Sequence, residues 1–322
     1  MNVHAPALAE QYRFDEATSV FAGDVIDDLS KYPKKLSPKY FYDVKGSELF
    51  EQITVLPEYY PTRTELSILR ERGGEITGLI PKGAALIEFG AGATTKVRLL
   101  LERCAFGAYV PVDISGDFLQ AQARDLRRDF PELDVYPVTA DFTTPFALPA
   151  AIAGMPKVGF FPGSTLGNFA DDEAVALMRA MATTMGANGQ ALIGIDLDKD
   201  PALIEAAYND AAGVTAEFTL NLLARLNREL GSDFDLGGFR HRALYARERG
   251  RIETALVSLR AQAVSVARHR FTFAADEAMR VEISNKYTDA RFDALARGAG
   301  LDVVGRWNDA DDWFGLRLLQ RA

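Results

Sequence analysis

The spacing of apolar runs between residues 84 and 195 constrains the fold more than any other feature of the chain. The run at 84–89 (AALIEF) is short and followed by glycines, and a helical spacing over 95–103 separates it from a second apolar run at 108–112. A strand, a helix and a second strand in this order form a βαβ unit of a parallel sheet. The alternation continues with a helix, two strands, a helix and a strand at 117–130, 135–140, 158–161, 172–185 and 191–195. We therefore predict a parallel sheet that is covered by helices on both faces.

After residue 196 this alternation stops. A helix-rich stretch at 201–230 is followed by apolar alternation at 251–260 and 268–273. The break predicts an insertion or a second subdomain. Further on, a strand, a helix and two closing strands are expected at 279–284, 290–298, 301–307 and 313–319. These closing elements are placed to complete the first sheet.

Composition excludes several classes of function. The chain has 322 residues, of which 48% are hydrophobic, so one large domain or two coupled domains are expected. A net charge of -9 argues against a nucleic-acid partner, which requires clustered Lys and Arg. Cys104 is the single cysteine, and the three histidines lack ligand spacing, so we expect neither disulfides nor a metal. Neither a signal sequence nor a membrane-spanning run is recognisable, which predicts a cytoplasmic protein without a membrane partner.

A glycine-rich turn follows the first expected strand. Gly90 and Gly92 lie where that strand would pass into a helix, and glycine allows both a tight turn and close approach of a ligand to the backbone. Thr95 occupies the position of the third glycine in a dinucleotide fingerprint. The pattern alone is equally consistent with a simple turn.

Two acidic residues at strand ends strengthen a ligand interpretation. Asp113 ends the second strand, 23 residues after Gly90, where a carboxylate can accept both hydroxyls of an adenosine ribose. Asp141 and Phe142 end the third strand, where an acid and an aromatic ring can bind and stack on adenine. Together these residues predict an adenosyl pocket at the carboxyl edge of the sheet.

Dinucleotides and S-adenosylmethionine both use such an edge. A pyrophosphate needs the full glycine fingerprint, whereas S-adenosylmethionine carries no phosphate and its methionyl carboxylate needs one positive partner. Lys96 follows the loop and is a candidate for that partner, although a solvated helix lysine is an equally good interpretation. An oxidoreductase is the alternative from another class.

The N-terminal segment adds a resemblance to a known family. Long motifs stand at 38–43 (PKYFYD), 46–50 (GSELF), 56–65 (LPEYYPTRTE) and 163–168 (GSTLGN), with further agreement around Tyr208, at 210–215, 227–230, 233–236 and 282–284. Over nearly its full length the chain resembles the bacterial histidine Nα-methyltransferases of ergothioneine biosynthesis.

The resemblance implies an α/β fold, with a Rossmann-like class I methyltransferase core at 61–198 and 288–322 and a substrate-binding domain at 1–60 and 199–287. It implies S-adenosylmethionine as methyl donor, without a metal. The implied cofactor contacts are Gly90, Lys96, Asp113, Asp141 and Phe142. The implied substrate contacts are Tyr59, Asn168, Tyr208, Glu282 and Ser284, with Tyr42 as the catalytic residue beside the reacting amine.

These residue types suit those roles. Asn168 and the tyrosine hydroxyls can bind an amino acid's amine and carboxylate, and Glu282 with Ser284 offers an acceptor and a hydroxyl to an imidazole. Thr254 departs from the family, which usually has a methionine lining the substrate pocket at this point, so the space around the imidazole is expected to be wider.

The sequence therefore predicts an enzyme that methylates the α-amino group of L-histidine, three times in succession, to give hercynine. Another free aromatic amino acid such as tryptophan is the alternative substrate. An oxidoreductase and a binding protein without catalytic activity are more distant alternatives. A monomer is the expected form.

Overall fold

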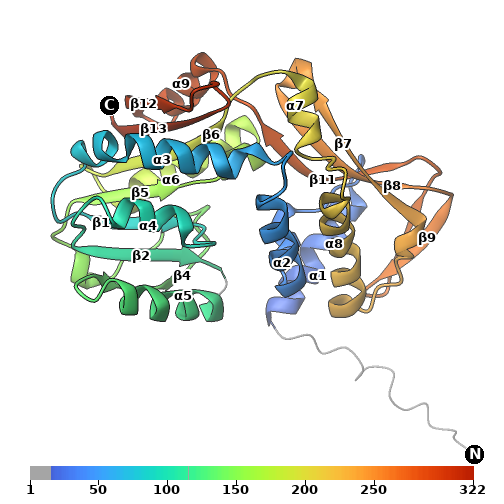
Figure 1. Ribbon diagram of the computed structural model, residues 1–322. Coiled ribbons are helices and arrows are strands. Elements are labelled where there is room, and N and C mark those ends of the chain that lie inside the picture. The colour runs from blue at the N-terminus through green and yellow to red at the C-terminus, as the bar shows by residue number, and fades with distance from the viewer. Residues whose placement is uncertain (1–15, 115) are drawn as a thin grey trace, which may run out of the picture. The chain divides into compact units, whose positions relative to one another are not determined.

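The computed structural model describes residues 16–114 and 116–322 (Figure 1). Its contacts divide the chain into two compact units. The core unit comprises Thr54–Tyr208, Tyr245–Ile252 and Ile283–Ala322, and the accessory unit comprises the described residues up to Ile53 with Asn209–Leu244 and Glu253–Glu282. The start of the predicted substrate-binding domain lies outside the described residues, and the division into functional domains stays a prediction.

The core unit contains an eight-stranded sheet with the order β12-β13-β6-β5-β1-β2-β3, in which β4 also pairs with β2. The strands β1, β2, β5 and β6 and the short β3 and β4 run parallel, and β13 is antiparallel to both of its neighbours, β6 and β12. Their bounds are β1 Ala85–Phe89, β2 Ala108–Asp113, β3 Asp134–Val135, β4 Val138–Thr139, β5 Lys157–Phe161, β6 Gln190–Asp196, β12 Leu301–Asn308 and β13 Phe314–Arg321.

Burial on both faces explains why the parallel strands read as continuous apolar runs. All five residues of β1 are buried, and successive side chains point to opposite faces. Ala85 and Ile87 belong to an apolar cluster with α6 and α9, whereas Leu86 packs with α3, α4 and α5. Figure 1 shows these helices along the sheet. Their bounds are α3 Tyr60–Gly78, α4 Thr95–Leu101, α5 Gly116–Asp129, α6 Asp171–Met185 and α9 Asp289–Gly298.

The strand order reverses at β1, because β2 pairs with one edge of β1 and β5 with the other. Ligands of open α/β sheets bind at such a switch point, beyond the carboxyl ends of the strands. The predicted Rossmann-like core is thereby confirmed. The single strand predicted at 135–140 is wrong in detail, since β3 and β4 are separated by Tyr136 and Pro137. Proline has no N–H to donate to a strand ladder, which accounts for the interruption.

The accessory unit combines helices with strands, and the residues of β7, β8 and β11 are divided between this unit and the core unit. A three-stranded sheet has the order β11-β8-β7, and β9 and β10 form a hairpin. The rings of Phe41 and Phe218 lie 4.7 Å apart and join η1 to α8. The bounds are α1 Glu16–Ser30, η1 Pro38–Phe41, α2 Val44–Thr54, α8 Val214–Leu230, β7 Phe239–Ala246, β8 Arg251–Ser258, β9 Gln262–Val266, β10 His269–Phe273 and β11 Ala278–Asn285.

Candidate active site

The turn after β1 has the geometry that its glycine predicts. Gly90 has φ of +74°, a conformation that L side chains rarely adopt. The N–H groups of Gly90 and Ala91 both donate to the carbonyl of Val112 at 2.9 Å, which fixes the turn against β2. A Cβ at Gly90 would lie 3.4 Å from the ring of Phe142, so glycine also keeps that approach open.

The two predicted strand-end carboxylates come to the same edge of the sheet. Asp113 closes β2 and pairs in register with Thr139 of β4, and the N–H of Ala140 donates to the carbonyl of Asp113 at 3.1 Å. One oxygen of Asp141 accepts from the N–H and the hydroxyl of Thr143, at 2.9 and 2.6 Å, which orients this carboxylate. The backbone therefore places Gly90, Asp113 and Asp141 at adjoining strand ends.

Lys96 is held by a partner that sequence reasoning missed. Its Nζ lies 2.6 Å from a carboxylate oxygen of Glu65, whose side chain is fully buried. Glu65 also accepts from the N–H of Gly163 at 2.9 Å. An ammonium group has three donors, so this ion pair leaves donors for a ligand carboxylate. The signal available in the sequence was the position of Glu65 at the end of the distinctive motif at 56–65.

A second buried carboxyl lies under the glycine turn. Glu88 of β1 is 2% exposed and accepts a hydrogen bond from the hydroxyl of Tyr109. Burial raises the pKa of Glu88 to about 7, against the lowering effect of the Tyr109 hydrogen bond. The protonation of this carboxyl therefore changes near neutral pH.

The donor set at this edge fits S-adenosylmethionine. The glycine turn admits a ligand close to the backbone, Asp113 offers a carboxylate for a ribose, and Lys96 offers a cation for a carboxylate. Phe142 offers a ring face for a base, and its ring packs edge-on against Phe161 at 5.7 Å. The switch point and these side chains define a Rossmann-like class I methyltransferase.

A buried charge network lies at the carboxyl end of β6, in the core unit. Asp196 is 1% exposed and pairs with two lysines, Lys286 at 2.7 Å and Lys199. The hydroxyl of Tyr60 donates to Asp196 at 2.9 Å. Burial opposes ionisation of Asp196, yet the ammonium groups of Lys286 and Lys199 hold its pKa below the usual value. Sequence reasoning missed this network, although Tyr60 lies within the motif at 56–65 and Lys286 follows the stretch 282–284 by two residues.

Two predicted substrate contacts are joined through this network. The hydroxyl of Tyr208 donates to the Oγ of Ser284 at 2.7 Å. The Nζ of Lys286 donates to the same Ser284 oxygen at 2.8 Å and to the Tyr208 hydroxyl at 3.0 Å. Tyr59, a third predicted contact, directly precedes Tyr60 at the start of α3.

Asn168 lies in the same unit, on a loop that Asn285 clamps. The amide of Asn285 donates to the carbonyls of Gly167 and Phe169, at 3.0 and 2.7 Å, on either side of Asn168. A Cβ at Gly167 would lie 3.0 Å from the Asn285 carbonyl oxygen, so a side chain there would crowd the backbone of Asn285. The core unit thus gathers Asn168, Tyr208 and Ser284, each from a different part of the chain.

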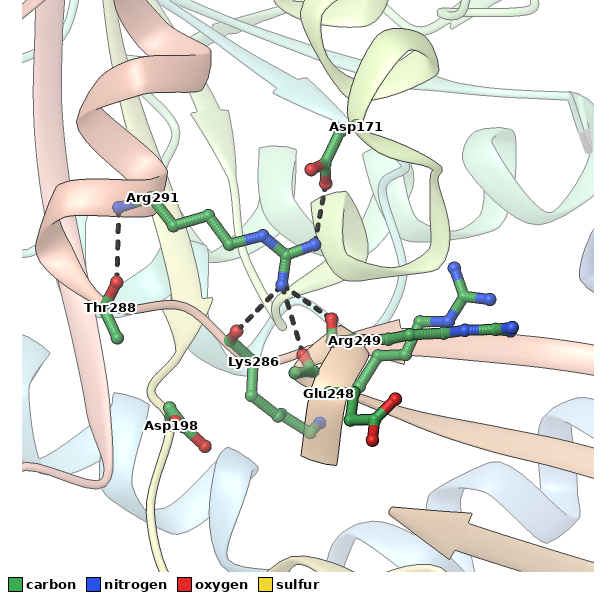
Figure 2. Close-up of a pocket in the computed structure, with 9 residues that line it drawn as sticks. Asp171, Asp198, Glu248, Arg249, Lys286, Thr288 and Arg291 are labelled. Atoms are coloured by element: carbon green, nitrogen blue, oxygen red, sulfur yellow. Dashed lines mark hydrogen bonds and ion pairs between the residues drawn. The ribbon is translucent and has the colours of Figure 1, made fainter. Parts of the chain in front are cut away.

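An open hollow of about 580 Å³ borders the segment after β11 (Figure 2). One nitrogen of Arg291 donates to the carbonyls of Arg249, Gly250 and Lys286, at 3.2, 3.2 and 3.3 Å. Its other terminal nitrogen donates to Asp171 at 2.7 Å. Arg291 therefore fixes the backbone at Lys286.

Three predicted residues belong to the accessory unit. Tyr42 is 47% exposed, and its ring packs edge-on against Phe50 and Phe218 at 5.6 and 5.8 Å. Thr254 on β8 is 2% exposed, and its hydroxyl has no hydrogen-bond partner among the described residues. Glu282 is half-buried and stands two residues before Ser284 on β11.

The backbone beside Tyr42 is fixed by its neighbour Asp43. One oxygen of Asp43 accepts from the N–H of Gly46 at 2.7 Å and from Asn221 at 2.8 Å, and the other accepts from Arg228 at 2.6 Å. A Cβ at Gly46 would lie 1.9 Å from the carbonyl oxygen of Phe41. The turn that carries Tyr42 is therefore tied to α8 and has no room for a side chain at Gly46.

Within the part of the chain that the structure describes, no group of three or more His, Cys, Asp or Glu residues could hold a metal ion. No helix in that part is long and apolar enough to cross a membrane.

Comparison with known proteins agrees with the class defined by fold and site. Residues 21–321 match a family described as SAM-dependent, histidine-specific methyltransferases. The histidine N-alpha-methyltransferase of Mycolicibacterium smegmatis is 38% identical over 98% of this chain and 99% of its own, and that of Mycobacterium tuberculosis is 39% identical over 92% and 93%. An L-tryptophan methyltransferase of Psilocybe serbica is 28% identical over 92% and 91%. The chain belongs to the SAM-dependent histidine-specific methyltransferase family.

Proposed function

We propose that this protein transfers methyl groups from S-adenosylmethionine to the α-amino nitrogen of L-histidine, three in succession, to give hercynine for ergothioneine biosynthesis. Membership of the family supports this proposal. The observation that carries it is the hydrogen-bonded pair Tyr208 and Ser284, beside the clamped loop of Asn168. The core unit thus offers Asn168 and Tyr208 for the amine and carboxylate of an amino acid, and the hydroxyl of Ser284 for its ring.

The methyl donor is proposed to bind at the carboxyl edge of β1, β2 and β4. Asp113 would accept the ribose hydroxyls, and Lys96 would bind the methionyl carboxylate. Asp141 and Phe142 would hold the adenine. Gly90 keeps the backbone accessible to the ligand at this turn.

Methyl transfer from a sulfonium is an in-line displacement that needs no covalent help from the protein. The chain's part is to hold a neutral amine on the line of the departing sulfur, at a near-attack separation of about 3 to 3.5 Å. We assign this task to Asn168, Tyr59 and Tyr208, which bind the amino-acid end. Glu282 and Ser284 bind the imidazole.

Tyr42 is proposed to stand beside the reacting amine. Its hydroxyl would accept a hydrogen bond from the early amine, and its ring face would stabilise the methylated cation that forms later. Before each of the three transfers the ammonium loses one proton, to water or to a nearby group, so that a neutral amine attacks the methyl carbon. The edge-on packing of the Tyr42 ring against Phe50 and Phe218 supports a fixed ring orientation.

A cytoplasmic monomer is the proposed form of the protein. The single cysteine, Cys104, is free and suits a reducing compartment. Size-exclusion chromatography with light scattering would test the monomer, since a dimer would double the 35.3 kDa mass.

The test of function is mass spectrometry of each common amino acid after incubation with the enzyme and S-adenosylmethionine. A gain of three methyl groups on histidine, with little change to other amino acids, is the expected result. Absence of any methylated histidine would contradict the proposal.

Methylation of another free aromatic amino acid is the second candidate. Thr254 is a buried threonine where the family usually has methionine, and its hydroxyl has no hydrogen-bond partner among the described residues, which favours a wider pocket. The resemblance to a tryptophan methyltransferase supports the same alternative. Preferential methylation of tryptophan in the same experiment would select it.

A further inference from the structure

The ammonium group of Lys286 uses all of its donors inside the protein. Its Nζ lies 2.7 Å from Asp196, 2.8 Å from Ser284 and 3.0 Å from the Tyr208 hydroxyl. Lysine has three N–H donors and no acceptor, so these three bonds exhaust it. The side chain is 0% exposed. Lys286 therefore has no donor left for a substrate, and its effect must pass through the groups that it binds.

The hydroxyl oxygen of Ser284 accepts hydrogen bonds from two donors. It accepts from Lys286 at 2.8 Å and from the Tyr208 hydroxyl at 2.7 Å. A serine oxygen has two acceptor positions and one proton, so both acceptor positions are occupied. What Ser284 still offers is its own hydrogen. Buried polar groups rarely stay unpaired, so this hydrogen calls for an acceptor.

We propose that Lys286 is a positioning residue that makes Ser284 a hydrogen-bond donor, and thereby selects a side chain whose ring presents an unprotonated nitrogen. This inference rests on the proposed function, in which Ser284 binds the imidazole. A neutral imidazole has one N–H donor and one acceptor nitrogen, whereas an imidazolium has two donors and no acceptor. An indole has a donor only, and a phenyl ring has neither.

Charge in the network acts in the same direction. Two ammonium groups, of Lys286 and Lys199, face the single carboxylate of Asp196, so the cluster repels a cationic ring. The titratable and charged groups around Lys286 and Ser284 include Asp196, Lys199, Tyr60, Tyr208 and Glu282, which stands two residues before Ser284. They also include Tyr245 with Asp198, which accepts its hydrogen bond, and Arg291, which donates to the Lys286 carbonyl. Glu282 is the one carboxylate among these groups that is proposed to accept a hydrogen bond from the ring. Both the imidazolium and the neutral imidazole have an N–H that Glu282 can accept.

The backbone keeps Lys286 in this position. The N–H of Tyr287 donates to the carbonyl of Asp196 at 2.9 Å, and the N–H of Asp198 donates back to Tyr287 at 3.0 Å. These two bonds set the segment after β11 alongside the end of β6. Asp196 and Lys286 therefore meet because their backbones are paired, and not only because their charges attract.

The test is the pH dependence of histidine binding, measured by calorimetry between pH 5 and 8 with the enzyme saturated with S-adenosylhomocysteine. In the wild type, binding should weaken below about pH 6.5, where free imidazole becomes protonated. In this range the Kd for histidine should rise about tenfold per pH unit, on top of any pH dependence seen above it. In Lys286→Met the Ser284 hydroxyl gains a free acceptor position. The change of slope near pH 6.5 in the plot of log Kd against pH, here called the break, should then disappear. KM for histidine should rise with little change in kcat.

Two further variants keep the test informative if Lys286→Met folds poorly. Lys286→Met/Asp196→Asn removes the Lys286 ammonium together with the carboxylate that it pairs with and leaves Lys199, and it should reduce the break because Ser284 again has a free acceptor position. Ser284→Ala leaves Lys286 in place and should reduce the break to the part that the charge of the network imposes, because the donor itself is gone. Circular dichroism at each pH establishes that the variants remain folded.

The outcomes separate the inference from the function. If the wild type binds and methylates histidine but shows no break, Ser284 does not require an acceptor and the inference is wrong. If Lys286→Met keeps the wild-type break, Lys286 does not set the direction of the hydroxyl. If the wild type neither binds nor methylates histidine, the proposed function fails, and the inference fails with it.

Discussion

The ammonium group of Lys96 lies 2.6 Å from the carboxylate of Glu65, which is completely buried within the core unit. Lys96 is proposed to bind the methyl donor, so one side chain serves both folding and binding. Removing one partner of a buried ion pair leaves an uncompensated charge, which is costlier than removing both. The two roles can therefore be separated by a double substitution.

We predict that Lys96→Met lowers the free energy of unfolding by roughly 3 kcal/mol or more and weakens S-adenosylmethionine binding. Lys96→Met/Glu65→Gln should recover most of the stability, because glutamine can still accept from Gly163, but it should not recover cofactor affinity. Urea unfolding and calorimetric titration measure the two effects. Recovery of affinity in the double variant would show that Lys96 does not contact the ligand.

Glu88 should make stability depend on pH in the direction opposite to most carboxylates. Its folded pKa of about 7 lies above the ordinary value of 4.5, so between these values the unfolded state loses the proton first. The contribution of protonated Glu88 to the free energy of unfolding is fully present below pH 4.5. It is lost as pH rises through 7, which lowers the free energy of unfolding by about 3 kcal/mol. Glu88→Gln should therefore gain stability relative to wild type as pH rises from 5 to 8, in urea unfolding at each pH. A constant difference across this range would contradict the elevated pKa.

Asn168→Ala should lower kcat/KM for every amino acid that the enzyme accepts, by roughly 10- to 100-fold, because a hydrogen bond to a charged group is lost. Cofactor affinity in the same variant serves as the internal control and should stay within about twofold. Steady-state kinetics on histidine and tryptophan distinguish the outcomes. A loss restricted to histidine would mean that Asn168 reads the side chain.

Glu282→Ala should lower kcat/KM for histidine sharply and raise relative activity on phenylalanine and tryptophan. In the wild type a ring without an N–H leaves the carboxylate unpaired. A site built to hydrogen-bond a substrate N–H can reject analogues that lack it by ~10⁴- to 10⁵-fold. Kinetics on the three substrates measure this selectivity. An unchanged ratio of histidine to tryptophan activity would place side-chain recognition elsewhere.

Thr254→Val should stabilise the protein, by about 1 kcal/mol or more, because the change removes a buried hydroxyl that has no partner among the described residues and keeps the volume. Thermal unfolding with and without histidine provides the measurement. Stabilisation of the free protein but a weaker gain with histidine bound would indicate that the substrate partners this hydroxyl. A loss of stability in the free protein would show that the hydroxyl is satisfied.

Local sequence patterns predicted the parallel sheet and the ends of its strands well. Gly90 and Asp113 were identifiable because the elements that position them are their immediate neighbours in the chain. The bond between Tyr208 and Ser284 could not be predicted from pattern, since the two residues are 76 positions apart in the sequence and meet only in the folded core unit. The family resemblance named both residues but not Lys286, which connects them. The break between β3 and β4 was missed because apolar periodicity does not weigh the absent N–H of Pro137.

The missing space at Gly46 limits how selectivity can be re-engineered. A methyl group there would overlap the backbone of Phe41, only one residue before Tyr42, and backbone cannot rotate aside as a flexible side chain can. Libraries aimed at Tyr42 and its surroundings should therefore leave position 46 unvaried, because a displaced turn would be mistaken for a chemical effect. The rings of Phe50 and Phe218 pack against Tyr42, so substitutions at these two positions change its surroundings without displacing the turn.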